Sequence, residues 1–222
     1  KKNGLWIQYP LKHIKGHYIH GKIIQNFSMG DLHGTSKRFF PDGSIQLIAN
    51  FKYGTKDGLI EEYFSDGKLS ARQYFSINSP VGLHEYYFPS GQLWKKHNFK
   101  GGVKHGQSIE YENNGVLVYK ANYKNGKLHG FYQRGLNQGI FMFGNAVGEW
   151  QEECYSCPNN AKVARGNYEK GKRQGDWHYY KRNDEKVMSI TYVDDIKSSC
   201  NWHGDKMDNE CDNILSSKIK KY

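Results

Sequence analysis

A glycine recurs every 24 residues along the middle of the chain, at Gly34, Gly58, Gly82, Gly106 and Gly130. The same residue types surround it in each copy. An aromatic residue stands seven positions before each of these glycines, and another stands five positions after the first four. A second glycine follows four positions later, with an aliphatic residue two positions beyond it. Because recurrence at a fixed period is the signature of repeat architectures, the sequence predicts a tandem array of one structural unit.

Each copy has the pattern of a β-hairpin. Pro41-Asp42-Gly43 and Asn113-Asn114-Gly115 are typical of hairpin turns, because the final glycine readily adopts the left-handed conformation that such turns require. In the strand that follows the first turn, Ile45, Leu47 and Ala49 recur at every second position, which predicts that they share one face. No apolar run of helical period and helical length is present. The sequence therefore predicts an all-β fold of tandem antiparallel β-hairpins.

The spacing of the glycines predicts where the repeat domain and the C-terminal tail begin and end. Regular 24-residue repeats extend over about residues 27–130, irregular repeats over 131–192, and the tail at 193–222 resembles a terminal cap. The step from Gly130 to Gly148 is 18 residues, which indicates a contracted hairpin. The next step, from Gly148 to Gly175, is 27 residues, and the surplus coincides with an insertion over residues 154–160. We therefore expect a repeat domain at 1–192 followed by a C-terminal cap.

This recurring pattern of glycine and aromatic residues resembles the repeat motif of the MORN-repeat family in its bacterial variant form. The segments most similar to the family's motif are Tyr123-Lys124-Asn125-Gly126-Lys127-Leu128-His129-Gly130 and Tyr168-Glu169-Lys170-Gly171-Lys172-Arg173-Gln174-Gly175-Asp176-Trp177. The resemblance implies an elongated, curved single-layer sheet. It also implies two functions, because variant-MORN proteins include antitoxins and immunity proteins, while other MORN proteins bind anionic membrane lipids or act as scaffolds.

Composition narrows the class of partner. The chain has 222 residues and a formal net charge of +10, which favours anionic lipids, nucleic acid or an acidic protein surface as the partner. A solvated surface that only keeps the protein soluble is the alternative. Its aromatic content of 15% argues against disorder, since disordered chains are poor in aromatic residues. No apolar stretch reaches the ~20 residues of a membrane span. Nucleic-acid binding is not predicted, because there is no basic stripe interleaved with stacking aromatics.

The four cysteines all lie in the last third of the chain. Their even number at the irregular end of the array favours disulfides, and we expect Cys154–Cys157 with Cys200–Cys211. Four free thiols in a cytosolic protein are the alternative. A zinc site is less favoured, because Cys154-x-x-Cys157 has no matching second half-site.

The chain has none of the familiar catalytic or nucleotide-binding motifs, so we expect no enzymatic activity, no cofactor and no metal. The histidines at positions 33, 105 and 129 precede framing glycines and are interpreted as turn residues. The regular aromatics form two ladders that we interpret as the core of the repeats: Phe51, Phe75, Phe99 and Tyr123, and Phe39, Tyr63, Tyr87 and Tyr111.

Binding therefore remains as the expected activity, and aromatics outside the ladders are the candidate contacts. The residues predicted to bind a partner are Phe40, Phe64, Tyr86, Phe88, Trp94, Glu61, Glu62 and Glu85. We expect a protein that is monomeric when free and that neutralises a toxin or effector by direct binding. An anionic phospholipid surface is the alternative partner. Because the chain opens at Lys1-Lys2-Asn3 without Met, we expect a periplasmic or secreted protein that has lost a signal peptide, with the cytoplasm as the alternative.

Overall fold

The structure is a computed structural model that describes residues 1–9, 21–155, 157 and 160–203. The chain divides into two compact units, Lys1–Leu117 and Val118–Tyr222. We call these the N-terminal unit and the C-terminal unit. Nineteen β-strands lie in the described ranges, and none of these residues forms an α-helix. In this part of the chain, accordingly, no helix is long and apolar enough to cross a membrane.

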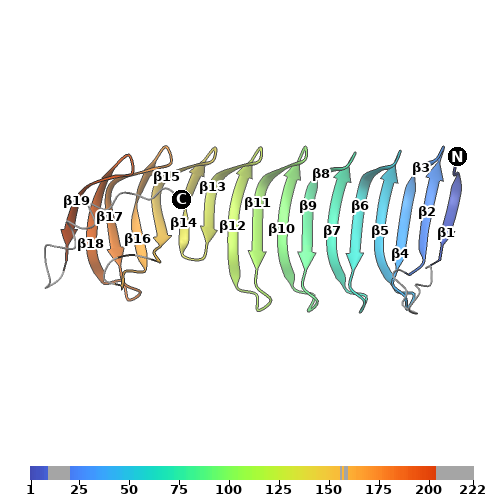
Figure 1. The fold of residues 1–222 in the computed structure, drawn as a ribbon, viewed down its shortest axis with the longest axis horizontal. Coiled ribbons are helices and arrows are strands. Elements are labelled where there is room, and N and C mark those ends of the chain that lie inside the picture. The colour runs from blue at the N-terminus through green and yellow to red at the C-terminus, as the bar shows by residue number, and fades with distance from the viewer. Residues whose placement is uncertain (10–20, 156, 158–159, 204–222) are drawn as a thin grey trace, which may run out of the picture. The chain divides into compact units, whose positions relative to one another are not determined.

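Eleven strands lie in the described residues of the N-terminal unit, 1–9 and 21–117 (Figure 1). They are β1 (Gly4–Gln8), β2 (Ile23–Ser28), β3 (Asp31–Leu32), β4 (Gly34–Phe39), β5 (Ile45–Lys52), β6 (Thr55–Tyr63), β7 (Leu69–Ser76), β8 (Ser79–Pro80), β9 (Gly82–Tyr87), β10 (Leu93–Lys100) and β11 (Val103–Tyr111).

The C-terminal unit is also built from consecutive β-strands, and its first strand, β12, begins at the unit boundary (Figure 1). Its strands are β12 (Leu117–Lys124), β13 (Lys127–Arg134), β14 (Asn137–Met142), β15 (Asn145–Glu153), β16 (Val163–Glu169), β17 (Lys172–Tyr180), β18 (Lys186–Val193) and β19 (Ile196–Trp202). β19 pairs with β18 beyond Tyr192. The predicted division at residue 192 stays a prediction.

Every strand pairing within each unit is antiparallel and joins strands that are adjacent or nearly adjacent in sequence. In the N-terminal unit β2 pairs with β4 and β7 with β9, because β3 and β8 are two-residue strands inside the connecting turns. In the C-terminal unit each strand from β12 to β19 pairs with the next. The prediction of an all-β fold of tandem antiparallel hairpins is confirmed.

The turn glycines have the predicted backbone conformation. Gly43, Gly67, Gly91 and Gly115 have φ values of 91°, 81°, 90° and 84°. In each of these turns the glycine N–H donates a hydrogen bond to the carbonyl oxygen of the residue three positions earlier, as from Gly43 to Phe40 at 3.0 Å. Only glycine adopts this region of φ freely, so its spacing in the sequence reports the spacing of the hairpins.

The predicted alternation after the turns is interrupted by β-bulges. Phe39 pairs with Ile45, but Arg38 pairs with Leu47, so β5 has one residue more than β4 at this point. Such an extra residue changes the side to which the neighbouring side chains point. Ile45 and Leu47 therefore do not continue a simple alternation, and equivalent shifts occur between β6 and β7 and between β9 and β10.

The predicted contracted hairpin is present in the C-terminal unit. Arg134 pairs with Asn137, so only Gly135 and Leu136 connect β13 to β14. The predicted insertion also follows, between β15 and β16. It returns to the sheet where Cys154 N–H donates a hydrogen bond to the Lys162 carbonyl oxygen at 2.8 Å.

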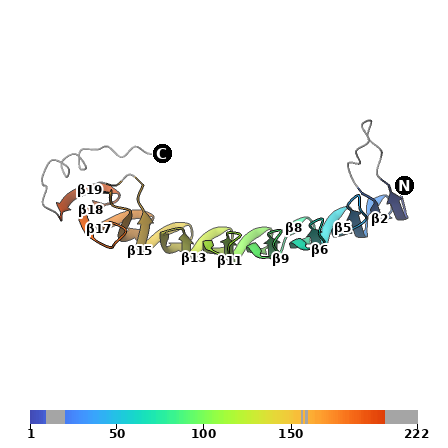
Figure 2. The same ribbon diagram turned by 90° about the horizontal axis from the view of Figure 1, so that it is seen from below.

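The two units bury their side chains differently. The strands of the N-terminal unit lie in a single layer, and the buried positions on them are occupied mainly by small or polar residues such as Ser36, Ala49 and Ser108 (Figure 2). In the C-terminal unit the strands curl at the β17–β19 end (Figure 2). A hydrophobic cluster lies there, in which Trp177 and Met188 are fully buried, and Ala161 of the insertion packs into it.

Replacing Gly67 with valine is expected to lower the free energy of unfolding by ~1 kcal/mol or more, since a β-branched residue strongly disfavours positive φ. No other atom lies within 4 Å of the position that a Cβ at Gly67 would occupy, so the effect measures backbone strain alone. Gly67→Asn is the control, because asparagine tolerates this conformation. Urea unfolding of both variants checks the prediction, which is wrong if the valine variant is as stable as the parent.

Candidate functional site

A row of side chains crosses one face of the N-terminal unit at the predicted binding residues. We call it the central row; its members, in order from β4 to β11, are Arg38, Leu47, Glu62, Ala71, Tyr86, Lys95 and Glu110. Each is the Cα partner of the next, and partners in an antiparallel pair project to the same face. The charged members alternate in sign along the row, from Arg38 to Glu62 and from Lys95 to Glu110. This face therefore presents both charges at short intervals.

Three predicted aromatic residues, of which Tyr86 belongs to the central row, come together on it. The rings of Phe88 and Trp94 are 5.8 Å apart between centroids, and Trp94 is 41% exposed. Lys95 Nζ lies 4.1 Å from the centroid of the Trp94 ring and 4.7 Å from that of Tyr86. Tyr86 is held in place by a hydrogen bond of 2.8 Å from Gln73 Nε2 to its hydroxyl oxygen. We call Tyr86, Phe88, Trp94 and Lys95 the aromatic cluster.

Phe40 and Phe64 lie in the turns of earlier repeats, at the position that Phe88 occupies in its own turn. The carbonyl oxygen of each residue accepts the hydrogen bond from the turn glycine, and all three side chains are half-buried. Their spacing of 24 residues means that they belong to the repeat frame rather than lying outside it. Their assignment as residues that bind a partner stays a prediction.

Glu61 and Glu85 do not share a face with Glu62 and Tyr86. Both are Cα partners of Arg72 on the opposite side of the sheet. Arg72 Nη2 lies 3.0 Å from Glu61 Oε1, and the Tyr63 hydroxyl donates to Glu61 Oε2 at 3.0 Å. The predicted contact residues are thus divided between two faces, because successive residues of a strand point to opposite sides.

A buried polar row missed by the sequence analysis lies on the same face as the central row. His84 and Ser108 are the Cα partners of His97 on either side, and all three side chains are buried. His84 Nε2 donates a hydrogen bond to the Tyr74 carbonyl oxygen at 2.7 Å. His97 Nδ1 and Ser108 Oγ have no hydrogen-bond partner among the described residues. Burial lowers the pKa of His84, and burial with the nearby charges of Lys104 and Lys95 lowers the pKa of His97 to about 4.

The burial of His97 predicts that acid lowers the stability of the N-terminal unit. In the unfolded chain His97 takes up a proton near its ordinary pKa of 6.5, whereas in the folded chain it does so only near about 4. The unfolded state therefore binds more protons between these values, and the free energy of unfolding is expected to fall as pH decreases from about 6.5 to about 4. Glu110, whose Oε1 lies 4.0 Å from His97 Nε2, opposes this effect, while Lys95, Lys104 and His84 reinforce it.

Urea unfolding at several pH values checks this prediction. His97→Asn removes the titrating group and should flatten the dependence, even if it changes the stability itself. An unchanged slope in that variant would assign the acid sensitivity to other residues.

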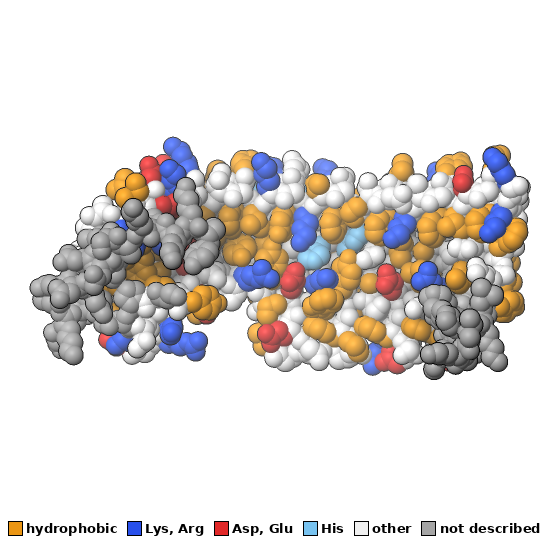
Figure 3. All heavy atoms as spheres, viewed as in Figure 1, with side chains coloured by type: hydrophobic (Ala, Val, Ile, Leu, Met, Phe, Trp, Pro, Cys, Tyr) orange, Lys and Arg blue, Asp and Glu red, His pale blue; other side chains and the backbone are white. Residues whose placement is uncertain are grey.

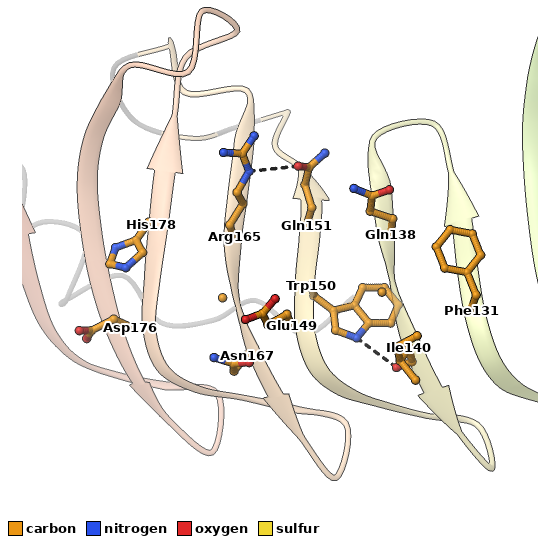
Figure 4. Close-up of a pocket in the computed structure, with 12 residues that line it drawn as sticks. Phe131, Gln138, Ile140, Glu149, Trp150, Gln151, Arg165, Asn167, Asp176 and His178 are labelled. Carbon is orange, nitrogen blue, oxygen red and sulfur yellow. Dashed lines mark hydrogen bonds between the residues drawn. The ribbon is translucent and has the colours of Figure 1, made fainter.

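A groove of about 810 Å³ lies on the sheet of the C-terminal unit (Figure 4). One wall is a polar row on neighbouring strands, in which Gln138, Gln151, Arg165 and His178 are successive Cα partners. Arg165 Nε donates to Gln151 Oε1 at 3.0 Å, and Arg165 Nη2 forms an ion pair with Asp184 at 2.8 Å.

A second polar row lies beside the first in the same groove. Glu149 of β15 is the Cα partner of Asn167 of β16, and Asp176 follows on β17 (Figure 4). Phe131 and Ile140 supply the apolar end. None of these residues was singled out from the sequence, because their juxtaposition depends on strand register across the irregular repeats rather than on any local motif.

The cysteine prediction is confirmed in the part that the structure describes. Cys154 and Cys157 form a disulfide within the insertion, and both pack against the hydrophobic cluster of the C-terminal unit. Cys200 lies on β19 and is not a free thiol. Its expected partner, Cys211, lies outside the described residues. Within those residues, no group of three or more His, Cys, Asp or Glu side chains is arranged to hold a metal ion.

Comparison with known protein families supports the prediction of tandem repeats. Three segments match the family described as MORN repeat variant, at residues 32–53, 80–100 and 104–125. These three segments are similar to MORN repeats. All three matches fall within the N-terminal unit except for the last residues of the third, which extend into β12. A comparison with curated proteins finds no similar sequence. MORN repeats are generally binding modules for proteins or lipids, which agrees with the expectation of a non-catalytic binding protein.

Proposed function

We propose that this MORN-repeat chain binds another protein and acts as an inhibitor of the immunity or antitoxin kind. The aromatic cluster on the central row is the observation that carries the proposal. Tyr86 and Trp94 are of the residue types that dominate the binding energy of protein interfaces, and Trp94 is 41% exposed in the free chain. Neither ring is buried in a hydrophobic core, since the strands of the N-terminal unit lie in a single layer.

The charge pattern around the cluster favours a protein over an anionic surface. Glu62 and Glu110 flank Tyr86 and Lys95 along the central row. A uniformly negative surface would be repelled by both carboxylates, whereas a protein surface can match alternating signs. The space-filling view shows the same mixture, with basic and acidic side chains interspersed among hydrophobic ones over the strands of this unit (Figure 3).

The central row is also long enough for a stable complex. It crosses seven strands from β4 to β11, which at about 4.8 Å between neighbours spans about 30 Å. A specific interface buries more than about 1,000 Å² in total, and a strip of this length offers that without a deep pocket.

The test is co-expression of the chain with the product of the adjacent reading frame, because an inhibitor and its target are usually encoded together. We expect a stoichiometric complex on size-exclusion chromatography and relief of growth inhibition caused by the neighbouring product. A neighbouring product that is neither toxic nor bound would refute the immunity role.

An anionic membrane surface is the second candidate, and a different observation favours it. Met29, Tyr53 and Ile77 occupy equivalent turns at one edge of the N-terminal unit and are 76%, 69% and 72% exposed. Lysines accompany them, as where Lys52 Nζ lies 5.9 Å from the Tyr53 ring centroid. Exposed apolar side chains beside basic ones are typical of surfaces that enter the lipid headgroup region.

Vesicle sedimentation separates this candidate from the first. Binding to vesicles of phosphatidylglycerol and phosphatidylcholine that is lost in Tyr53→Ser and Ile77→Ser, but retained in Trp94→Ala, would support the membrane surface. The absence of vesicle binding would exclude the membrane surface, and vesicle binding that requires Trp94 but not Tyr53 or Ile77 would exclude the turn residues as the lipid contact.

A periplasmic or secreted location is part of the proposal, and the Cys154–Cys157 disulfide supports it, because disulfides persist in oxidising compartments. Chain isolated from its native host under denaturing alkylation should show no modified thiol by intact-mass measurement. Four modified thiols would place the chain in a reducing compartment and would contradict both predicted disulfides.

A further inference from the structure

We infer that the groove of the C-terminal unit binds a neutral polyhydroxylated ligand, the chemistry of an oligosaccharide. The inference does not rest on the proposed function, since it concerns the other unit and other residues. It follows from which polar groups in the groove remain available for a ligand, what charges they have, and how they are held.

The available groups are amides and carboxylates on adjacent strands, beside one half-buried imidazole. Within the described ranges, the side chains of Gln138, Glu149 and Asn167 form no hydrogen bond or ion pair. His178 Nδ1 is buried and has no partner there either. Asp176 accepts one hydrogen bond, from Thr191 Oγ1 at 2.6 Å, which leaves it further accepting capacity. The side chains of Gln138, Glu149, Asn167 and Asp176 are exposed in one open groove, and the His178 ring borders it (Figure 4).

The charges of the groove argue against an anionic ligand. Arg165 is its one cation within the lining, and its guanidinium is already engaged by Gln151 and by the carboxylate of Asp184. Burial and the nearby charge of Lys186 lower the pKa of His178, so this ring is neutral at neutral pH. Glu149 and Asp176 would repel a phosphate or carboxylate.

The amides argue against a simple cation. An ammonium or guanidinium group donates hydrogen bonds and cannot accept them, so it would contact the two carboxylates and make no use of the N–H groups of Gln138 and Asn167. A hydroxyl group both donates and accepts. Several hydroxyls on one ligand can therefore donate to Glu149 and Asp176 while accepting from the two amides, which matches the whole set.

The apolar and structural parts of the groove fit the same ligand. Phe131 and Ile140 offer an apolar surface at one end, against which the C–H face of a sugar ring can pack. The floor is sheet backbone at Gly139 and Gly166, and on its other side the rings of Trp150 and Trp177 lie directly against these glycines. A floor packed in this way fixes the backbone from which the polar rows project, which reduces the entropic cost of binding. The volume of about 810 Å³ lies within the range of small-ligand sites.

The test is ligand-observed NMR of the full chain with four neutral trisaccharides: maltotriose, cellotriose, mannotriose and triacetylchitotriose. We expect saturation transfer to at least one of them. Glu149→Gln and Asn167→Ala should each weaken its binding by about tenfold, the effect of losing one or two hydrogen bonds. Glu169→Gln is the matched control, because Glu169 is an exposed carboxylate on β16 outside the groove lining.

A second readout locates the ligand without relying on the variants. Binding should shift the ring resonances of His178 and the indole N–H resonance of Trp150, whose Nε1 donates to the Ile140 carbonyl oxygen at 3.2 Å. Arginine amide and inorganic phosphate serve as cationic and anionic probes. The inference is overturned if none of the four sugars binds, if the groove variants bind as the parent does, or if either charged probe binds the groove in their place.

Discussion

Replacing Trp177 with alanine is expected to lower the free energy of unfolding of the C-terminal unit by ~3–5 kcal/mol, the cost typical of removing a buried tryptophan. Trp177 is 0% exposed, and its ring lies against the backbone of Gly166. Its Nε1 donates to the Asn167 carbonyl oxygen at 3.1 Å, and its ring centroid lies 5.2 Å from that of Tyr168. The variant therefore loses both packing and a hydrogen bond, and the space it leaves is bounded by a sheet that cannot easily collapse.

Urea unfolding followed by circular dichroism measures the effect. Trp94→Ala is the matched control, because the same residue type in the N-terminal unit is 41% exposed and should change stability far less. Equal losses in the two variants would mean that the hydrophobic cluster does not stabilise the C-terminal unit in the way its burial indicates.

Replacing Trp94 or Tyr86 with alanine is expected to weaken binding to the protein partner by ~2 kcal/mol each, or about thirtyfold in Kd, if the aromatic cluster is the centre of the interface. The two residues share Lys95, whose ammonium lies over both rings. Their effects should consequently not be additive in the double variant. Calorimetry or surface plasmon resonance with the purified complex gives the change in Kd.

The control for this prediction is Trp6→Ala, since Trp6 is 45% exposed on β1 and lies outside the central row. The salt dependence of the binding rates is a second test of the aromatic interface, because charges around such an interface act mainly on the association rate. Raising the salt concentration should slow association more than it speeds dissociation. A Trp6 variant that binds as poorly as the Trp94 variant would remove the aromatic cluster from the interface.

The fold could be predicted because the features that determine it are local. A hairpin turn requires positive φ within a few residues, and Gly43, Gly67, Gly91 and Gly115 supply it at fixed spacing. The contracted hairpin at Gly135 was predicted for the same reason, from a shortened step between glycines. Such signals survive in a single sequence because each depends on one residue type at one place.

The candidate sites were harder to predict because they depend on which face a side chain occupies. The bulge between Ile45 and Leu47 and its counterparts in later repeats change the face within a single strand, and no residue type marks them. Glu61 and Glu62 point to opposite sides simply because they are successive residues of one strand, so only one of them can lie on the central row. The groove was missed because it joins residues from five strands whose register is set by an irregular hairpin and an insertion.

The pairing of each strand with its near neighbours in sequence has a kinetic consequence. Within each unit no described pairing joins strands separated by more than one other strand, so the chain closes only short loops as it folds. Sheet proteins usually fold slowly because distant segments must meet, whereas folding rates rise as the sequence separation of contacts falls. Each unit should therefore assemble hairpin by hairpin, beginning before its later repeats have left the ribosome. Adding or deleting a whole 24-residue repeat would change its length without changing its folding route.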